Sequence, residues 1–187
     1  MTPPVPRHSV FVAFGSNVGD SRQIVDNALT VLEQHGAFDD VVVSRLYRTR
    51  AEGPAQADYL NGVFRARTAL GPFEVLDVLH FVEQLFGRVR RQSWGPRTLD
   101  LDLLAHDRVV LATPRLTLPH PRLEQRGFVL APMVDLDPDW IHPVSGQSSF
   151  ASLRRWLTAT PDAAERVVAL PSAPARPAPQ RPVEVVP

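Results

Sequence analysis

The sequence predicts an α+β domain, a ferredoxin-like antiparallel sheet with helices packed on it. Two observations lead to this prediction. Apolar runs of strand type alternate with two segments of helical periodicity, and their order along the chain is strand, helix, strand, strand, helix, strand. The length of 187 residues also fits one domain of ordinary size. We therefore expect a single core formed by residues 9–170.

The first half of this domain contains three predicted strands and one predicted helix. Residues 9–15 form a short apolar run that stops at Gly-Ser-Asn, as a buried strand does before a turn. Apolar residues then recur at helical spacing from Ser21, which we expect to cap the helix, to Gly36, which ends it. Residues 41–47 and 59–70 follow as two strands, joined by a long loop.

The second half of the pattern begins with a helix that Pro72 opens and Gly87 closes. Residues 98–105 are expected to form a strand, because apolar and polar side chains alternate there. A short second strand is expected at residues 108–111, after a turn. Together these elements complete the split pattern of the predicted fold.

Beyond the last strands, we expect short helical segments around residues 122–135 and 150–158. Residues 171–187 contain six prolines and few apolar anchors, so they are predicted to be a disordered tail. Residues 1–8 are predicted to be a disordered N-terminus.

Composition excludes several classes of function. The chain has 20 basic and 20 acidic residues, so its net charge provides no long-range attraction to nucleic acid or to an anionic membrane. It has no Cys, which excludes a disulfide framework and a thiolate metal site. No stretch approaches the ~20 apolar residues of a membrane span. We expect a soluble, cytoplasmic monomer whose partners are small molecules.

The most informative segment is W-G-P-R-T-L-D-L-D-L-L at residues 94–104. Its leucines alternate with polar residues, so a strand would bury the leucines and place Asp100 and Asp102 together on the other face. Their Cα atoms would lie about 6–7 Å apart. Like charges at this separation repel, and a divalent cation removes that cost. Because carboxylate oxygens favour Mg²⁺ over zinc or copper, the pair indicates a magnesium site.

An isolated pair of this kind more often marks solvated aspartates on an exposed strand, but its surroundings favour a site for magnesium and polyphosphate. Cations flank the pair on both sides: Arg88, Arg90, Arg91 and Arg97 before it, and Arg115, His120, Arg122 and Arg126 after it. Such groups stabilise the charge that develops on transferred phosphates. The chain has no P-loop and no G-x-G-x-x-G pattern, so Walker-type and Rossmann-type phosphate binding do not apply.

Six short motifs follow one another along the chain. They are F-G-S-N-V-G at 14–19, Y-R-T at 47–49, D-Y-L-N at 58–61, G-R-V-R at 87–90, W-G-P-R-T-L-D-L-D at 94–102 and L-P-H-P-R-L-E-Q-R-G-F-V-L-A-P at 118–132. In order and spacing they resemble the hydroxymethyldihydropterin pyrophosphokinase family. The resemblance covers the chain from about residue 9 to about residue 170, and the last two motifs are the most specific.

The resemblance implies an ATP-dependent pyrophosphokinase of folate biosynthesis. The family transfers the β,γ-pyrophosphoryl group of ATP to the hydroxymethyl oxygen of 6-hydroxymethyl-7,8-dihydropterin and leaves AMP. By the same resemblance, Asp100 and Asp102 bind two Mg²⁺ ions, and Arg88, Arg90 and Arg97 are catalytic. The residues at ATP-binding positions of the family are Glu83, Arg90, Arg97, Leu103, Arg115, Thr117, His120 and Arg126.

The resemblance also implies a pterin pocket. Two aromatic side chains would stack on the pterin ring, an amide and a backbone segment would read its hydrogen-bonding edge, and a tryptophan would close over it. The stacking residues are Tyr59 and Phe128, and Trp94 is the closing tryptophan. The edge is read by Asn61 and by the backbone near Thr49. Asp100 is shared between this pocket and the metal site.

Two other functions stay open on the sequence. A magnesium-dependent nucleotidyl or phosphoryl transferase with another acceptor would use the same aspartates and arginines, and the pterin pocket distinguishes the two. A non-catalytic RNA-binding module on the same scaffold is a different class. The zero net charge and the acidic pair on the sheet count against that module.

Overall fold

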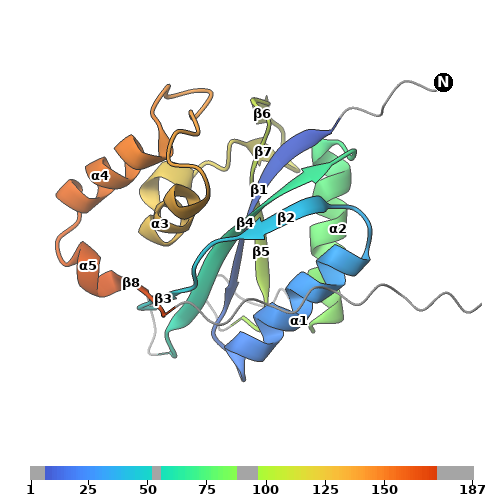
Figure 1. The fold of residues 1–187 in the computed structure, drawn as a ribbon, viewed down its shortest axis with the longest axis horizontal. Helices are drawn as coiled ribbons and strands as arrows, with labels where there is room; N and C mark the ends of the chain where they lie inside the picture. Colours follow the sequence, from blue (N-terminus) through green and yellow to red (C-terminus); the bar gives the residue numbers. More distant parts are fainter. Residues whose placement is uncertain (1–6, 52–55, 88–96, 172–187) are drawn as a thin grey trace, which may run out of the picture.

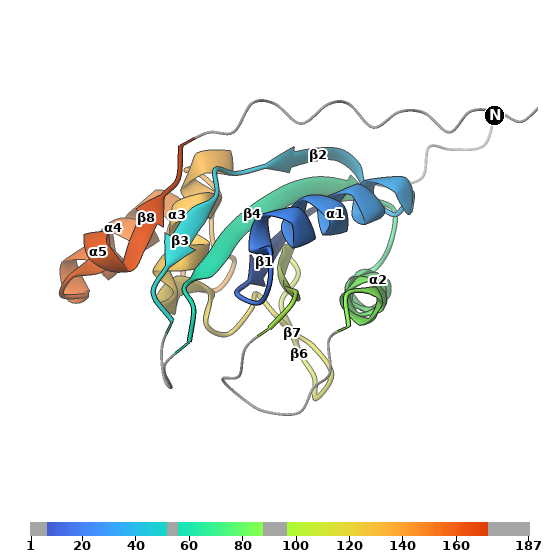
Figure 2. The ribbon, with the colours of Figure 1, turned by 90° about the horizontal axis from the view of Figure 1, so that it is seen from below.

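The computed structural model describes residues 7–51, 56–87 and 97–171. Within these ranges a sheet lies between helices α1 and α2 on one side and α3 and α4 on the other (Figure 1). Figure 2, turned by 90°, shows the same separation. Most of the predicted disordered N-terminus and tail lies outside the described residues.

The main sheet has six strands in the described part of the chain, in the order β5-β1-β4-β3-β8, with β2 also pairing with β4. All of these pairings are antiparallel. The strands are β1 (His8–Ser16), β2 (Asp39–Val43), β3 (Tyr47–Thr49), β4 (Tyr59–Thr68), β5 (Asp100–His106) and β8 (Val167–Ala169). A separate two-stranded sheet consists of β6 (Leu111–Ala112) and β7 (Thr117–Leu118).

The helices fall into two groups. On one side of the sheet are α1 (Ser21–Gln34) and α2 (Pro72–Leu85). After the small sheet follow the 3₁₀ turn η1 (Leu123–Gln125), α3 (Gly127–Leu136), α4 (Ser149–Ala159) and α5 (Ala163–Arg166). None of the helices in the described ranges is both long and apolar enough to cross a membrane.

Strand β1 lies between two hydrophobic cores and is buried on both faces. Val10, Val12 and Phe14 belong to the core beneath α1 and α2. The alternate residues Phe11 and Ala13 belong to the core shared with α3 and α4. This arrangement explains why the sequence shows a continuous apolar run here, because a strand covered on both faces has no polar side to alternate with.

The cap of α1 differs by one residue from the prediction. Asp20, and not Ser21, is the N-cap, and its Oδ1 accepts a hydrogen bond from Gln23 N at 3.0 Å. Both residue types are good caps, so the sequence pattern alone did not separate them.

The predicted strand at residues 41–47 is divided into β2 and β3. At the break, Ser44 Oγ accepts a hydrogen bond from Val63 N at 3.1 Å, while Ser44 N donates to Val63 O at 3.0 Å. A side-chain hydroxyl thus takes the place of a backbone acceptor in the ladder, which ends the regular pairing.

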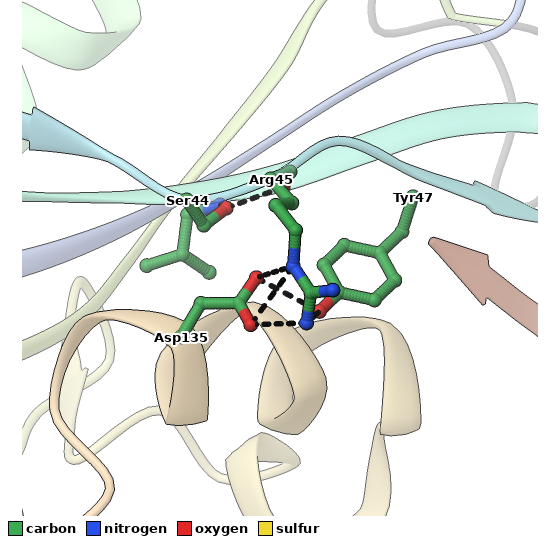
Figure 3. A network of polar contacts seen from close by, with 5 residues as sticks. Ser44, Arg45, Tyr47 and Asp135 are labelled. Carbon is green, nitrogen blue, oxygen red and sulfur yellow. Dashed lines mark hydrogen bonds and ion pairs between the residues drawn. The ribbon is translucent and has the colours of Figure 1, made fainter. Parts of the chain in front are cut away.

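The break directs Arg45 toward α3, where it forms a polar network with Tyr47 and Asp135 (Figure 3). Arg45 Nη2 donates to Asp135 Oδ1 at 2.6 Å, and Tyr47 Oη donates to Asp135 Oδ2 at 2.8 Å. Burial, together with the bond to Asp135, raises the pKa of Tyr47 to about 12. The network therefore fixes β3 on α3 by hydrogen bonds to a charged group, which are among the stronger ones in proteins.

Two further strand assignments changed. The short strand predicted at residues 108–111 is instead β6, which begins at Leu111 and pairs with β7. β8 was not predicted, although it continues the main sheet beyond β3. It pairs with β3 in full register, and Leu170 N donates to Leu46 O at 2.8 Å.

Candidate active site

Asp100 and Asp102 lie on β5, on the face of the sheet opposite to α1 and α2. Leu101 and Leu103 are each 3% exposed and belong to the core beneath those helices, whereas both aspartates are half-buried. The predicted separation of an apolar and an acidic face is confirmed. Because β5 is an edge strand of the described sheet, the acidic face is open from the side.

Each aspartate is paired with an arginine. Arg97 Nη1 donates to Asp100 Oδ2 at 2.5 Å, and Arg126 Nη1 donates to Asp102 Oδ2 at 3.1 Å. The four side chains are between 18% and 34% exposed, so these pairs are less screened than ion pairs on an open surface. The result is a compact centre of two carboxylates and two guanidinium groups.

His120 joins this centre from the segment before η1. Its Nε2 lies 3.9 Å from Asp102 Oδ2, and its Nδ1 accepts a hydrogen bond from Arg122 N at 3.1 Å. The Nε2 atom therefore carries the proton. Burial lowers the pKa of His120, and Arg126 and Arg122 lower it further against the opposing effect of Asp102. The imidazole is thus a neutral N–H donor at neutral pH.

A pocket of about 260 Å³ opens beside Asp102, between α2 and the β6–β7 sheet. Four of the residues predicted to contact the nucleotide line it: Leu103, Arg115, Thr117 and His120. Arg115 pairs with Asp77 of α2, and its guanidinium carbon lies 5.5 Å from the centre of the Phe73 ring. The structure therefore brings these residues from β5, β7 and their connecting loops to one place.

Glu83, also predicted at a nucleotide position, lies on the other side of β5. It is 2% exposed, and its Oε1 accepts a hydrogen bond from Leu101 N at 2.8 Å. This contact ties α2 to the edge strand between the two aspartates. The contact of Glu83 with a nucleotide stays a prediction.

A second wall of the site is built by neighbouring strands on the acidic face. Asp100 pairs with Gly15, Gly15 with Asn61, and the next step along β4 pairs Tyr59 with Thr49. Paired residues share a face of the sheet, so these side chains form one continuous surface with Asp100. Asn61 Nδ2 donates to Thr49 Oγ1, and both residues are buried.

Tyr59 lies within electrostatic reach of the charged centre. Burial raises the pKa of Tyr59; the charge of Arg97 opposes this rise, and the charge of Asp100 adds to it. Across the site, the guanidinium carbon of Arg126 lies 5.4 Å from the centre of the half-buried Phe128 ring. Arg126 therefore contacts both Asp102 and one of the two predicted stacking residues.

Residues 11–138 match the 7,8-dihydro-6-hydroxymethylpterin-pyrophosphokinase family. The chain belongs to this family. It is 41% identical over 145 residues to the 2-amino-4-hydroxy-6-hydroxymethyldihydropteridine pyrophosphokinase of Synechocystis, covering 78% of this chain and 74% of that protein. It is 44% identical over 131 residues to the enzyme of the same name from Pseudomonas aeruginosa, covering 70% of this chain and 81% of that protein.

A solved structure has the same fold. The crystal structure of Plasmodium falciparum HPPK-DHPS A437G with pteroate superposes with a TM-score of 0.70 at 12% identity, covering 90% of this chain and 47% of that one. This chain thus spans about half of that longer protein. The folic acid synthesis protein fol1 of Schizosaccharomyces pombe is 36% identical over 138 residues, which cover 73% of this chain and 19% of fol1. The chain is accordingly a pyrophosphokinase of folate biosynthesis with an antiparallel sheet and packed helices.

Three of the residues that the family resemblance marked, Arg88, Arg90 and Trp94, lie outside the described residues. Their roles stay predictions from the sequence.

Two further residues of the candidate site were not predicted from the sequence. Asn17 Oδ1 accepts a hydrogen bond from Arg97 N at 2.8 Å, and Asn17 Nδ2 donates to Gln56 Oε1 at 3.0 Å. Asn17 thus connects the segments on either side of the site. Gly15 leaves room for Asn61, because a Cβ atom added there would lie 2.6 Å from Asn61 Oδ1. Their shared signal is the F-G-S-N-V-G motif, which by itself predicted only a turn.

Proposed function

We propose that this chain transfers the pyrophosphoryl group of ATP to the hydroxymethyl group of 6-hydroxymethyl-7,8-dihydropterin with the residues of the candidate site. The observation that carries the proposal is the position of the charged centre. It lies between the pocket beside Asp102, for the nucleotide, and the wall of Thr49, Tyr59 and Asn61, for the pterin. Two substrates bound in these places would meet at the aspartates.

The reaction is a single displacement at phosphorus. The hydroxymethyl oxygen forms a bond to the β-phosphorus, and the bond from that phosphorus to the oxygen shared with the α-phosphate breaks. AMP leaves with that oxygen, and the hydroxyl proton is released. Catalysis of such a step is mainly alignment of the two substrates and stabilisation of charge on the phosphate oxygens.

Asp100 and Asp102 would hold two Mg²⁺ ions. The donor set fits, because two carboxylates on one open face of a strand supply the oxygen ligands that Mg²⁺ prefers. When bound, Mg²⁺ supplies charge neutralisation to the triphosphate.

Arg97 and Arg126 would exchange partners when substrates bind. In the structure each guanidinium balances one aspartate, which reduces the cost of two neighbouring carboxylates. Once cations balance the aspartates, both arginines can turn to the phosphate oxygens. Both guanidinium groups would then lie close to the transferred phosphates, so little reorganisation would be required.

His120 would add a neutral hydrogen bond. Its proton lies on Nε2, the ring nitrogen closer to Asp102, and the ring lines the nucleotide pocket. A neutral imidazole can donate its Nε2 hydrogen to a phosphate oxygen, and it carries no net charge at neutral pH.

The pterin would lie between Tyr59 and Phe128, with Asn61 at its edge. The carboxamide of Asn61 is oriented by its bond to Thr49, so its remaining donor and acceptor can pair with a flat heterocycle. Arg88 and Arg90 would contribute to phosphate binding and Trp94 would close the pocket, as the sequence predicts.

The finer fold assignment belongs to the same proposal. In the sheet the strands lie in the order β5-β1-β4-β3. Along the chain, α1 connects β1 to β2 and α2 connects β4 to β5. This arrangement supports a ferredoxin-like core. A monomeric state and a cytoplasmic location stay predictions.

The test is to incubate the protein with MgATP and 6-hydroxymethyl-7,8-dihydropterin and to measure AMP and the pterin diphosphate together by chromatography. We expect equal amounts of the two products, with AMP dependent on the pterin. AMP formed at the same rate without pterin would reject the acceptor and favour a transferase or hydrolase of another specificity.

A further inference from the structure

A group of side chains of the kinds that can ligate a metal ion lies at the opposite end of β5 from Asp100. His106 is the last residue of β5, Asp107 follows it, and His8 begins β1. One ligand atom from each of these three residues lies within 4.8 Å of the other two. Asp100 is about 20 Å away along the strand at 3.3 Å per residue, so this group is separate from the candidate active site.

The two ring nitrogens of His106 have different surroundings. It is 2% exposed, and its Nε2 bonds to Leu70 O at 2.9 Å. A carbonyl can only accept, so Nε2 carries the proton and Nδ1 has a lone pair. Within the described ranges Nδ1 is buried and has no hydrogen-bond partner. Histidines that bind a metal through one ring nitrogen usually donate the other ring N–H to a group such as a backbone carbonyl.

Asp107 is held in place by the chain around it. Its backbone has φ 46°, in the left-handed region, and its N donates to Ser9 O at 2.7 Å. Ser9 N donates in return to Asp107 Oδ1 at 2.7 Å. These backbone contacts hold the carboxylate in one orientation.

His8, the third residue of the group, shares a hydrogen bond with Asp107. His8 Nδ1 lies 2.6 Å from Asp107 Oδ2, and the ring centres of His8 and His106 are 4.8 Å apart. A metal ion that replaced the proton of this hydrogen bond would gain an imidazole and a carboxylate at once. Ligand atoms in a tetrahedral zinc site lie about 3.5 Å apart, so the observed spread requires only a small movement of the half-exposed His8.

We propose that His8, His106 and Asp107 bind one divalent transition-metal ion of the zinc class. Two imidazoles and one carboxylate suit Zn²⁺, whereas Mg²⁺ prefers oxygen ligands alone. The ion joins the start of β1 to the turn after β5, and it stabilises the folded chain because the unfolded chain does not hold the three ligands together.

The experiment uses the untagged full chain carrying Asp102→Asn, so that zinc binding at the acidic pair is weakened. Zn²⁺ binding is measured by calorimetry and by the metal content after gel filtration. We expect one ion per chain. At free Zn²⁺ a hundredfold above Kd, the melting temperature should rise by roughly 5–10 °C.

Three further variants in the same background assign the site. His8→Ala and Asp107→Asn should each weaken Zn²⁺ binding about 10- to 100-fold or more. His35→Ala removes an exposed histidine outside the group and should leave binding unchanged. Circular dichroism establishes that each variant is folded.

Visible absorption of bound Co²⁺ reports independently on the ligands. It is measured in the Asp102→Asn parent, which keeps His8, His106 and Asp107. A tetrahedral spectrum that disappears in His8→Ala supports the site. Unchanged Zn²⁺ affinity in both ligand variants, or no bound ion in the Asp102→Asn parent, would show that His8 and Asp107 form an ion pair and nothing more.

Discussion

Gly15 allows a sharp test of the proposed pterin wall (Thr49, Tyr59 and Asn61), because one added methyl group should displace the Asn61 side chain. In Gly15→Ala the new Cβ would lie 2.6 Å from Asn61 Oδ1, well inside van der Waals contact. The other close atoms are at 3.7 Å or beyond, so the strain falls on the Asn61 carboxamide. We expect that group to rotate or shift away from the ring edge.

The magnitude follows from the hydrogen bonds that are lost. Beyond the N–H donated to Thr49, the Asn61 carboxamide has a second N–H and a carbonyl oxygen for the pterin. At about 0.5–1.5 kcal/mol for each of two bonds, pterin binding should weaken roughly 5- to 150-fold. Titration calorimetry with pterin and a non-hydrolysable ATP analogue measures this loss, while the affinity for the analogue alone should stay within twofold.

Gly62→Ala is the matched control, since it places the same methyl group on the other face of β4. There it would lie 2.3 Å from Cζ of Phe14, a core ring that is 3% exposed. We expect a loss of about 1–3 kcal/mol of stability from overpacking, with pterin affinity nearly preserved. If Gly15→Ala binds pterin like the parent protein, Asn61 does not read the pterin edge, and this part of the site is wrong.

Three other predictions test the site and the fold. Asp102→Asn should lower kcat by on the order of 10³-fold with the melting temperature nearly unchanged, and turnover close to the parent value would remove Asp102 from the reaction. Asp135→Asn should cost about 1–3 kcal/mol in urea unfolding, because a charged acceptor of Arg45 and Tyr47 is lost, whereas Asp137→Asn, a weak pair at 3.8 Å, should change stability by less than about 0.5 kcal/mol. The third prediction concerns pH. Partial burial raises the pKa of Glu124, but hydrogen bonds from two serines and the charges of His142 and Arg155 lower it more. The contribution of Glu124 to stability is therefore complete above pH 4.5 and is lost as pH falls through the lowered pKa. Glu124→Gln should flatten this acid limb of the stability curve, and an unchanged limb would contradict the assignment.

The sequence predicted best where one residue's surroundings are set by its own strand or helix. Alternation along β5 was enough to separate Leu101 and Leu103 from the two aspartates, because the two-residue period of a strand is local geometry. The helix from Pro72 was equally predictable, since its start and its end are marked by Pro72 and Gly87.

What the sequence did not predict depends on contacts between distant segments. The division of β2 from β3 follows from a serine hydroxyl that meets a strand 19 residues further along the chain. Asn17 gained its role only when folding placed Arg97 beside it, 80 residues away. The periodicity of the sequence does not indicate contacts between distant segments. The site residues could be grouped only from the resemblance to a family.

The pairing of β8 with β3 has a consequence for where this domain can be cut. The segment that matches the family ends at residue 138, but the sheet receives its last strand from Val167–Ala169. A fragment trimmed to the family limits would present the unpaired backbone of β3 to solvent, and β3 contains Thr49 of the proposed pterin wall. Exposed strands of this kind recruit other chains. Expression of residues 7–138 should therefore yield self-associating material, while a boundary placed after residue 171 keeps the outer strand in its place.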